Sequence, residues 1–426
     1  MSELSYLEKL LDGVEVEWKM LGEVIHSLKT GLNPRQNFSL NTLDAQGYYV
    51  TVREIQNGKV VFLDKTDRVN DRALKIINGR SNLEAGDILF SGTGTVGRIA
   101  VIEENPINWN IKEGVYTIKP IKEKIAPRFL SYLLQSSKIV KDYSKKIVGN
   151  PVISLPMGDL KKLLIPIPCP GNPEKSLAIQ AEIVRILDKF TALTAELTAE
   201  LNMRKKQYNY YRDQLLSFDN EDVPHLPMGQ KDIGEFIRGG TFQKKDFMDA
   251  GVGCIHYGQI YTYYGTYTKK TKTHISAALA KKCKKAQKGN LIIATTSEND
   301  EDVCKAVAWL GSDDIAVSSD ACIYKHNLNP KYVSYYFQTE QFQNQKRQYI
   351  TGAKVRRVNA DNLSKILIPV PSMAVQERIV SILDKFDTLT NSITEGLPRE
   401  IELRQKQYEY YRDLLFSFPK PETASN

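Results

Sequence analysis

Two long stretches of the chain carry apolar residues at alternating spacings of four and three. In the first stretch they are Ile179, Ile183, Ile186, Phe190, Leu193 and Leu197, continued by Leu201, Tyr208, Tyr211 and Leu215. In the second they are Val375, Ile379, Ile382, Phe386, Leu389 and Ile393, continued by Ile401, Tyr408, Tyr411 and Leu415. This spacing is typical of the apolar seam of a coiled coil with irregular steps. It predicts two long helices.

The two predicted helices are expected to pair with each other. About 40 residues of helix span about 60 Å, which exceeds the width of a small domain. Two such helices bury their seams best in an antiparallel pair, which would place the segments before them at opposite ends. Gly396 and Pro398 fall inside the second stretch. Because proline in a helix interior costs about 3 kcal/mol, we expect a kink or short break there, with Pro398 opening the next helical segment.

The segments before each helix have a different pattern. Short β-rich runs such as GDILF, RIAVIEE, GVYTIKP, NLIIATT and ACIYKH are separated by Gly, Asn and Asp. Helical patches such as PRFLSYLLQSSKIV and PKYVSYYFQTEQFQNQ close each segment. Each segment is therefore predicted to be a mixed α/β domain.

The chain repeats itself once. Residues 180–190 match residues 376–386 at eight of eleven positions, and residues 204–218 match residues 404–418 at eleven of fifteen. A period this long indicates a tandem domain duplication. The predicted fold class is α+β: two mixed α/β domains, at 1–173 and 220–371, separated by two long antiparallel coiled-coil helices, at 174–219 and 372–426, in a pseudo-twofold internal repeat.

Size and composition agree with a folded chain of two to three domains. The 426 residues are 42% hydrophobic, and no apolar run reaches the roughly 18 residues of a membrane helix. The five cysteines form no Cys-x-x-Cys pair. They predict reduced thiols in a cytoplasmic protein, with no disulfide frame and no metal site.

A glycine-rich segment, Phe90 to Gly97, resembles two cofactor loops. Its glycines spell the Gly-x-Gly-x-x-Gly pattern of dinucleotide sites and also resemble an S-adenosylmethionine loop. A dinucleotide loop must open a helix, whereas a second strand-like run follows here. We therefore predict a β-hairpin turn ending in Arg98. That arginine would either contact a DNA backbone or base edge or be a plain surface residue.

Positive charge is concentrated near aromatic residues. The chain has a net charge of +8, and residues 269–288 hold eight lysines and no acid. Tyr263, Lys269, Lys270 and Lys272 are candidates for nucleic-acid contact, and a solvated face is the alternative. A second candidate region is residues 351–357, with Lys354, Arg356 and Arg357; its counterpart in the first repeat is residues 148–154, with Asn150.

The two repeated blocks closely resemble the specificity subunits of type I restriction-modification enzymes. The carrying motifs are Gln-x-x-Ile-Val-x-Ile-Leu-Asp-Lys-Phe, Arg-x-Lys-Gln-Tyr-x-Tyr-Tyr-Arg-Asp and the Ile-Pro-x-Pro run before each helix. The resemblance implies a non-catalytic subunit in which each recognition domain binds one half of a bipartite double-stranded DNA site. It also implies that the helices set the half-site spacing and dock two adenine methyltransferase subunits. Docking and pairing are expected of Ile183, Phe190, Leu197, Tyr208, Tyr211, Ile379, Phe386, Ile393, Tyr408 and Tyr411.

The cofactors implied belong to partners, not to this chain. The methyltransferase subunits would bind S-adenosylmethionine, and a motor-nuclease subunit, whose presence the resemblance leaves open, would use ATP and Mg. Two other classes remain as alternatives: a freestanding DNA methyltransferase, and a coiled-coil scaffold. A catalytic Asn-Pro-Pro-Tyr-type tetrapeptide, which a methyltransferase needs, does not occur in the sequence.

Overall fold

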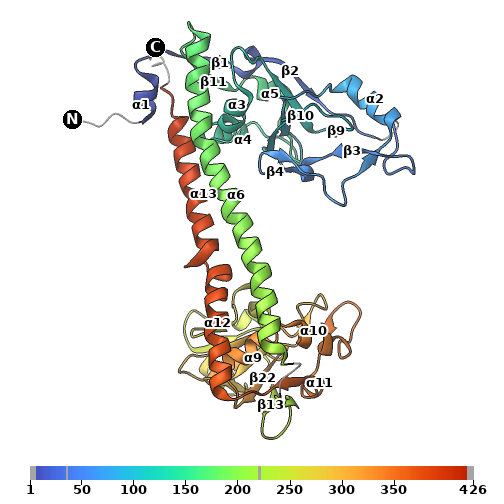
Figure 1. The fold of residues 1–426 in the computed structure, drawn as a ribbon, viewed down its shortest axis with the longest axis vertical. Helices are drawn as coiled ribbons and strands as arrows, with labels where there is room; N and C mark the ends of the chain where they lie inside the picture. Colours follow the sequence, from blue (N-terminus) through green and yellow to red (C-terminus); the bar gives the residue numbers. More distant parts are fainter. Residues whose placement is uncertain (1–5, 35–36, 219–221, 420–426) are drawn as a thin grey trace, which may run out of the picture. The chain divides into compact units, whose positions relative to one another are not determined.

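The repeated blocks form long helices, as their apolar spacing predicts. In the computed structural model, which describes residues 6–34, 37–218 and 222–419, the first block is the continuous helix α6 (Pro173–Ser217) (Figure 1). The second block forms α12 (Met373–Asn391) and α13 (Gly396–Leu415). The break between them confirms the expected interruption: Gly396 has a φ of +77°, and Pro398 lies in the first turn of α13.

Contacts divide the chain into two compact units. Unit 1 comprises residues 1–195 and 403–426, and unit 2 comprises residues 196–402. Each unit thus combines one variable segment with the start of the helix that follows it and the end of the other repeat's helix. These two units do not coincide with the four consecutive segments expected from the sequence. The boundaries of those segments stay a prediction.

Unit 1 contains a four-stranded antiparallel sheet of order β2-β10-β7-β8, a three-stranded sheet of order β6-β3-β9, and the pairs β1-β11 and β4-β5. Its elements before α6 are α1 (Tyr6–Leu11), β1 (Val16–Met20), η1 (Leu21–Glu23), β2 (Ile25–Thr30), β3 (Gly47–Val50), η2 (Val52–Glu54), β4 (Ile55–Gln56), β5 (Lys59–Val60), β6 (Arg68–Val69), α2 (Asp71–Arg80), β7 (Ile88–Ser91), β8 (Ile99–Val101), β9 (Trp109–Ile111), β10 (Val115–Pro120), α3 (Pro127–Leu134), α4 (Ser137–Ser144), α5 (Met157–Lys161) and β11 (Leu164–Pro168).

Unit 2 repeats this plan with sheets of order β13-β22-β18-β20-β15 and β16-β14-β21-β17 and the pairs β12-β24 and β19-β23. Its elements before α12 are β12 (His225–Pro227), β13 (Gly234–Arg238), η3 (Lys244–Asp246), β14 (Val252–Ile255), α7 (Tyr257–Thr262), β15 (Tyr267–Thr268), β16 (Thr273–Ile275), α8 (Ala277–Ala280), β17 (Lys285–Ala286), β18 (Leu291–Ala294), β19 (Thr296–Ser297), β20 (Ala306–Trp309), β21 (Ile315–Val317), β22 (Ala321–His326), α9 (Pro330–Tyr336), α10 (Glu340–Arg347), β23 (Arg356–Arg357), α11 (Ala360–Leu363) and β24 (Leu367–Pro369).

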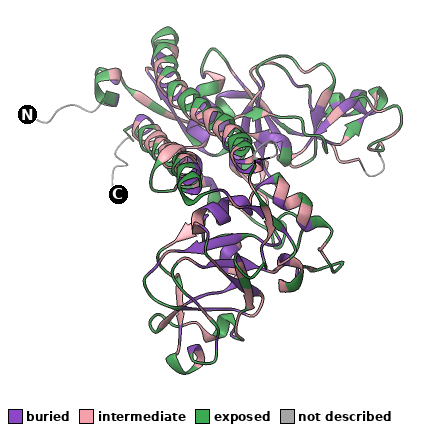
Figure 2. Ribbon diagram, turned by 60° about the horizontal axis from the view of Figure 1, so that its bottom comes forward, coloured by how far each residue is buried: buried purple, intermediate pink, exposed green. Residues whose placement is uncertain are grey.

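Strands β7, β18 and β20 of the two larger sheets are buried throughout, whereas several short strands, such as β1 and β13, and many loop residues are partly or fully exposed (Figure 2). The ends of the long helices complete both cores. In unit 1, Phe416 and Phe418 after α13 join the core that contains Ile183 and Leu187 of α6. In unit 2, the residue after α6, Phe218, joins the core that contains Leu383 of α12. The aromatic residue that closes each repeat therefore fills the unit built around the other repeat's variable segment.

Two predicted seam pairs make equivalent contacts in the two units. In unit 1 the rings of Phe190 and Tyr411 stack with centroids 5.3 Å apart. In unit 2 the rings of Phe386 and Tyr211 stack with centroids 5.7 Å apart. The helices of each unit therefore meet through the same residue types at the same repeat positions.

Other seam residues differ in their burial. Ile183, Ile379 and Tyr208 are buried in the cores of their units, Tyr408 packs at the edge of the unit 1 core, and Leu197 is half-buried. Ile393 departs from the predicted seam. It lies between α12 and α13 with 78% of its surface exposed, because the chain leaves the helix at Ser392.

Paired contacts also anchor each helix to its own variable segment. In unit 1 the Asp188 carboxylate accepts hydrogen bonds from Tyr132 Oη at 2.6 Å and from Arg128 Nη2 at 2.8 Å. In unit 2 Asp384 accepts from Tyr335 Oη at 2.7 Å and from Lys331 Nζ at 2.6 Å. The aspartate of the repeated Leu-Asp-Lys-Phe motif therefore has a structural role: it anchors each helix to the variable segment before it.

Candidate nucleic-acid interface

The glycine-rich segment after Phe90 is a hairpin turn. β7 and β8 pair as antiparallel neighbours on its two sides, so the segment joins two strands and opens no helix. The prediction of a hairpin is confirmed. At Gly97 φ is +95°, and an added Cβ would lie 2.5 Å from Tyr143 Oη, so glycine is required directly before Arg98.

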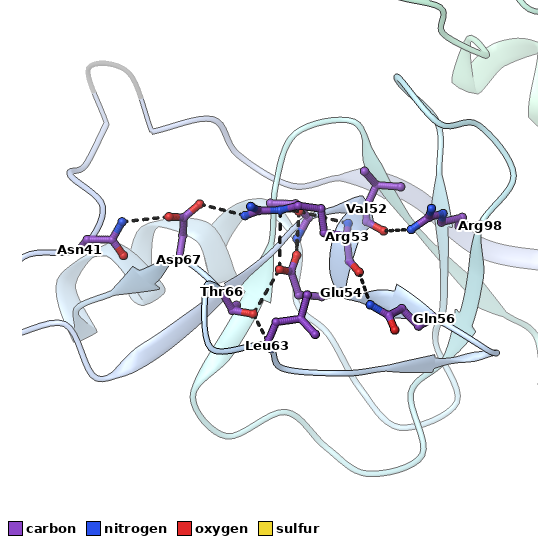
Figure 3. Close-up of polar contacts among 10 residues, drawn as sticks. Asn41, Val52, Arg53, Glu54, Gln56, Leu63, Thr66, Asp67 and Arg98 are labelled. Carbon is purple, nitrogen blue, oxygen red and sulfur yellow. Dashed lines mark hydrogen bonds and ion pairs between the residues drawn. The ribbon is translucent and has the colours of Figure 1, made fainter. Parts of the chain in front are cut away.

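Arg98 follows the turn and is exposed. Its Nη1 donates a hydrogen bond to the Val52 carbonyl oxygen at 3.2 Å, in the short helix η2 (Figure 3). Glu54 fixes that helical turn from below: its side chain is fully buried and accepts from the Thr51 backbone N–H at 2.8 Å and from Thr66 Oγ1 at 3.1 Å. The arrangement presents an exposed guanidinium group beside a rigid turn, which suits contact with a phosphate or a base edge.

A second guanidinium group lies on the same turn. Arg53 has 54% of its side chain exposed, and its Nη2 is 3.4 Å from Asp67 Oδ2. Asp67 also accepts from Asn41 Nδ2 at 2.9 Å (Figure 3). The sequence pattern does not indicate that Arg53 lies near Arg98, because this proximity depends on contact between η2 and the start of β8.

Asn150 lies on a closed loop that touches the hairpin turn. Val148 and Ser154 exchange backbone hydrogen bonds of 2.8 and 2.7 Å, which close the loop. The Gly94 N–H donates to the Ile153 carbonyl oxygen at 2.8 Å. Asn150 is exposed at the tip of the loop and therefore belongs to the same surface region as the turn.

The loop of residues 351–357 has the same frame in unit 2. Thr351 and Arg357 exchange backbone hydrogen bonds of 2.9 Å each. Gly149 and Gly352 both have positive φ, and in both an added Cβ would lie 2.2 Å from the carbonyl oxygen three residues later. The equivalence of the two loops, expected from the sequence, is therefore a structural fact.

The loop in unit 2 carries three basic side chains. Lys354 and Arg357 are exposed, and Arg356 has 35% of its side chain exposed. Arg356 Nε forms an ion pair with Asp300 Oδ1 at 2.8 Å, and its Nη1 donates to the Gly352 carbonyl oxygen at 2.6 Å. The Arg356 guanidinium is thus held in one orientation before any ligand binds.

A buried lysine supports the segment that carries Asp300. Lys346 in α10 is fully buried, and its Nζ donates to the carbonyl oxygens of Glu301 at 3.0 Å and Val303 at 2.8 Å. Burial lowers the pKa of this ammonium group below its usual value. Lys346 is the seventh residue of α10, and Tyr143 is the seventh residue of α4. The same helix position therefore lies against the loop between the two equivalent strands in each unit, as a lysine in unit 2 and as a tyrosine beside Gly97 in unit 1.

The lysine-rich stretch of unit 2 has its basic residues on the surface. Lys269, Lys270 and Lys272 are exposed, and the Lys272 ammonium nitrogen lies 4.6 Å from the centre of the Tyr263 ring. Tyr263 is 56% exposed, whereas the neighbouring Tyr264 is buried, and burial raises its pKa to about 12. Tyr263 is therefore a surface aromatic residue beside cations, a combination suited to polyanion binding.

Sequence reasoning missed Arg53, Asp300, Lys346 and Lys305, the last of which directly precedes β20. For Lys305 the sequence holds only a partial signal: GDILFS aligns with GNLIIA, but Arg98 follows Ser91 after six residues and Lys305 follows Ala294 after ten, so a gap of four residues must be placed before the two coincide. The other three depend on contacts between distant segments. In the described ranges no helix has the length and apolar character to cross a membrane, and no cluster of three or more His, Cys, Asp or Glu has a metal-binding arrangement.

One family model and several individual proteins match this chain, and their descriptions agree. The family model for the type I restriction modification DNA specificity domain matches residues 14–204 and again residues 227–403. The chain is 40% identical over 437 residues to the EcoR124I/EcoR124II specificity subunit of Escherichia coli, with all of both chains covered. It is 33% identical to the EcoprrI specificity subunit of Escherichia coli over 413 residues, covering 93% of each chain.

A solved structure shares the fold. It comes from work on complex assembly and conformational transition of the type I R-M system, and it aligns with a TM-score of 0.62 at 15% identity, covering 94% of this chain and 97% of the other. The two-copy arrangement of mixed α/β units and long helices therefore occurs in a solved protein.

Proposed function

The chain belongs to the family of type I restriction-modification specificity subunits, and we propose that it is the non-catalytic DNA-reading subunit of such a complex. The observation that carries the proposal is that the loops at 148–154 and 351–357 have the same backbone frame but different side chains. Residues 152–154 are Val, Ile and Ser in unit 1, and the equivalent residues 355–357 are Val, Arg and Arg in unit 2. Two equal frames with different donors suit the reading of two different half-sites in one double-stranded DNA site.

We also propose that the helices dock two methyltransferase subunits. Tyr210 and Tyr410 occupy the same repeat position and are 61% and 65% exposed, and each makes an edge contact with the next tyrosine. Exposed aromatic residues are frequent anchors of protein interfaces. One such pair in each unit supports two copies of the same partner.

The chemistry of the complex would reside in the partners. S-adenosylmethionine would bind the methyltransferase subunits, which would methylate adenine. ATP and Mg would serve a motor-nuclease subunit where one joins the complex. This chain would act in the cytoplasm and would contribute DNA contacts and spacing.

Mapping methylated bases in the host genome, with and without this gene, tests the proposal. We expect one bipartite sequence, with two defined halves and an undefined spacer, whose methylation disappears when the gene is deleted. Methyl transfer to DNA by the purified chain alone would instead indicate a freestanding methyltransferase. DNA binding that stays undetectable both with and without partner subunits would indicate a scaffold.

A further inference from the structure

Arg98 and Lys305 occupy the same position in the two units. β7 and β8 of unit 1 correspond to β18 and β20 of unit 2 in the order of the sheets. Each basic residue immediately precedes the second strand. The Ser91 N–H donates to the Arg98 carbonyl oxygen at 2.9 Å, and the Ala294 N–H donates to the Lys305 carbonyl oxygen at the same distance.

The loops before these residues attach to the rest of each unit in one register. In unit 1, Thr93 forms a β-bridge with Ser154, and in unit 2, Thr296 pairs with Arg357. Both threonines lie two residues after the end of their first strand. Six residues separate Ser91 from Arg98, and ten separate Ala294 from Lys305, so the extra residues of unit 2 follow the shared bridge.

The side chains of Arg98 and Lys305 also reach equivalent helical turns. Arg98 Nη1 donates to the Val52 carbonyl oxygen at 3.2 Å, and Lys305 Nζ donates to the Tyr261 carbonyl oxygen at 3.4 Å. These acceptors lie in η2 and α7, which follow β3 and β14, each an inner strand of the smaller sheet of its unit.

The two turns share an internal support. In η2 the Thr51 backbone N–H donates to Glu54, which also accepts from Thr66. In α7 the His256 backbone N–H donates to the Gln259 side chain, which also bonds Thr273. The basic residue thus bonds to the helix that begins with this supported turn in both units, at its first residue, Val52, in unit 1 and at its fifth residue, Tyr261, in unit 2.

We propose that Arg98 and Lys305 are equivalent phosphate anchors, one in each unit, and this rests on the proposed DNA-reading function. Both positions carry a positive charge, on a planar guanidinium group in unit 1 and on a compact ammonium group in unit 2. Neighbouring positions change their chemistry altogether, as Ile153 and Arg356 do. Two units that read different bases still meet the same phosphate backbone, so a position that keeps only its charge suits the phosphate.

The test is a salt titration of DNA binding by the full chain bound to the methyltransferase subunit of its host. Two duplexes of equal length are used: one with the mapped methylated site, and one with both half-sites scrambled. We expect Arg98→Ala and Lys305→Ala each to weaken binding to both duplexes and to reduce the salt slope by about 0.9. The double variant should lose about twice that slope, and the affinity ratio between duplexes should not change.

Charge-preserving variants and distant lysines provide the controls. Arg98→Lys and Lys305→Arg should keep the wild-type slope, as should Lys9→Ala in α1 and Lys231→Ala before β13, which remove exposed charges from units 1 and 2. An unchanged slope in both alanine variants, or a loss of affinity confined to the duplex with the methylated site, would overturn the anchor assignment. A wild-type complex that binds both duplexes equally would instead refute the proposed DNA-reading function.

Discussion

Asp300 on one loop of unit 2 holds Arg356 on the neighbouring loop, with Oδ1 and Nε 2.8 Å apart. The carboxylate limits the orientations of the guanidinium and also competes with a ligand for it. A pre-oriented arginine loses less side-chain freedom on binding. This relationship makes Arg356 the sharpest candidate for base reading in the chain.

Arg356→Ala should cost about 1–3 kcal/mol in binding if the residue reads a base. The loss should be confined to DNA that carries the half-site of unit 2, because unit 1 keeps its own loop. Binding of the assembled complex to duplexes with one half-site scrambled measures this. Equal weakening on every duplex would reassign Arg356 to phosphate contact.

Asp300→Asn is the companion variant. It keeps Arg356 and the size of residue 300 but removes the charge that orients the guanidinium. We expect DNA affinity to change less than in Arg356→Ala, and discrimination between correct and altered unit 2 half-sites to fall. Unchanged discrimination would show that Asp300 does not position Arg356 for reading.

Lys270→Ala should weaken binding evenly across DNA sequences. Lys270 is exposed in the segment between β15 and β16, close in sequence to Lys269 and Lys272. Loss of one phosphate contact lowers the salt slope by about one unit. Titrations from low to moderate salt measure the slope, and an unchanged value would assign this lysine to a solvated face.

Lys346→Met should destabilise unit 2, with a cost that depends on pH. The variant leaves the carbonyl oxygens of Glu301 and Val303 without their donor. Burial lowers the folded-state pKa of Lys346 below 10.5, so between these two pKa values the unfolded chain binds more protons than the folded chain. The free energy of unfolding contributed by Lys346 therefore rises with pH over that interval.

Denaturant unfolding of wild type and Lys346→Met over a series of pH values that approaches 10.5 from below measures this dependence. Trp309 is the tryptophan of unit 2, so its fluorescence, in a background with Trp18→Phe and Trp109→Phe, follows that unit. The stability difference should widen as pH rises. A difference that is constant over the range would contradict the role assigned to the buried ammonium group.

Truncation after Phe218 should produce a chain that pairs with itself. Unit 1 would lose Tyr411, Phe416 and Phe418, which complete its helix contact and core. Residues 204–218 match the lost residues 404–418 at eleven of fifteen positions, so a second copy supplies the same groups. We expect a dimer by light scattering that, with the methyltransferase, directs methylation of a symmetric site.

Leu216→Asp in the truncated chain is the control, because Leu216 is buried in the core that the end of α6 completes. This variant should not dimerise. A truncated chain that stays monomeric, and inert in the presence of the methyltransferase subunit, would contradict the exchange of equivalent helix ends.

Tyr210→Ala combined with Tyr410→Ala should weaken docking of the methyltransferase subunit. Both side chains are largely exposed, so the fold should be retained. An aromatic interface anchor contributes about 2 kcal/mol or more, about 30-fold in affinity. Tyr263→Ala, an exposed tyrosine in the variable segment of unit 2, should leave docking unchanged; equal docking by the double variant would place the partner elsewhere.

The amino-acid sequence by itself determined the repeat, the two helical blocks and the break between α12 and α13. Apolar spacing along one segment is a local property, and so is the effect of Gly396 and Pro398 on a helix. The hairpin before Arg98 was also predictable, because a strand-like run follows its glycines. The pattern failed at Ile393, where the spacing continues but the backbone has already left the helix.

The tertiary structure decided which residues share a surface. The hydrogen bonds from Arg98 to Val52 and from Lys346 to Val303 each join residues more than 40 positions apart. The ion pair between Asp300 and Arg356 does the same. Such contacts depend on sheet order and loop length, which side-chain periodicity does not encode. The equivalence of Arg98 and Lys305 emerged for the same reason: their loops differ in length and sequence, and only the shared strands and bridges align them.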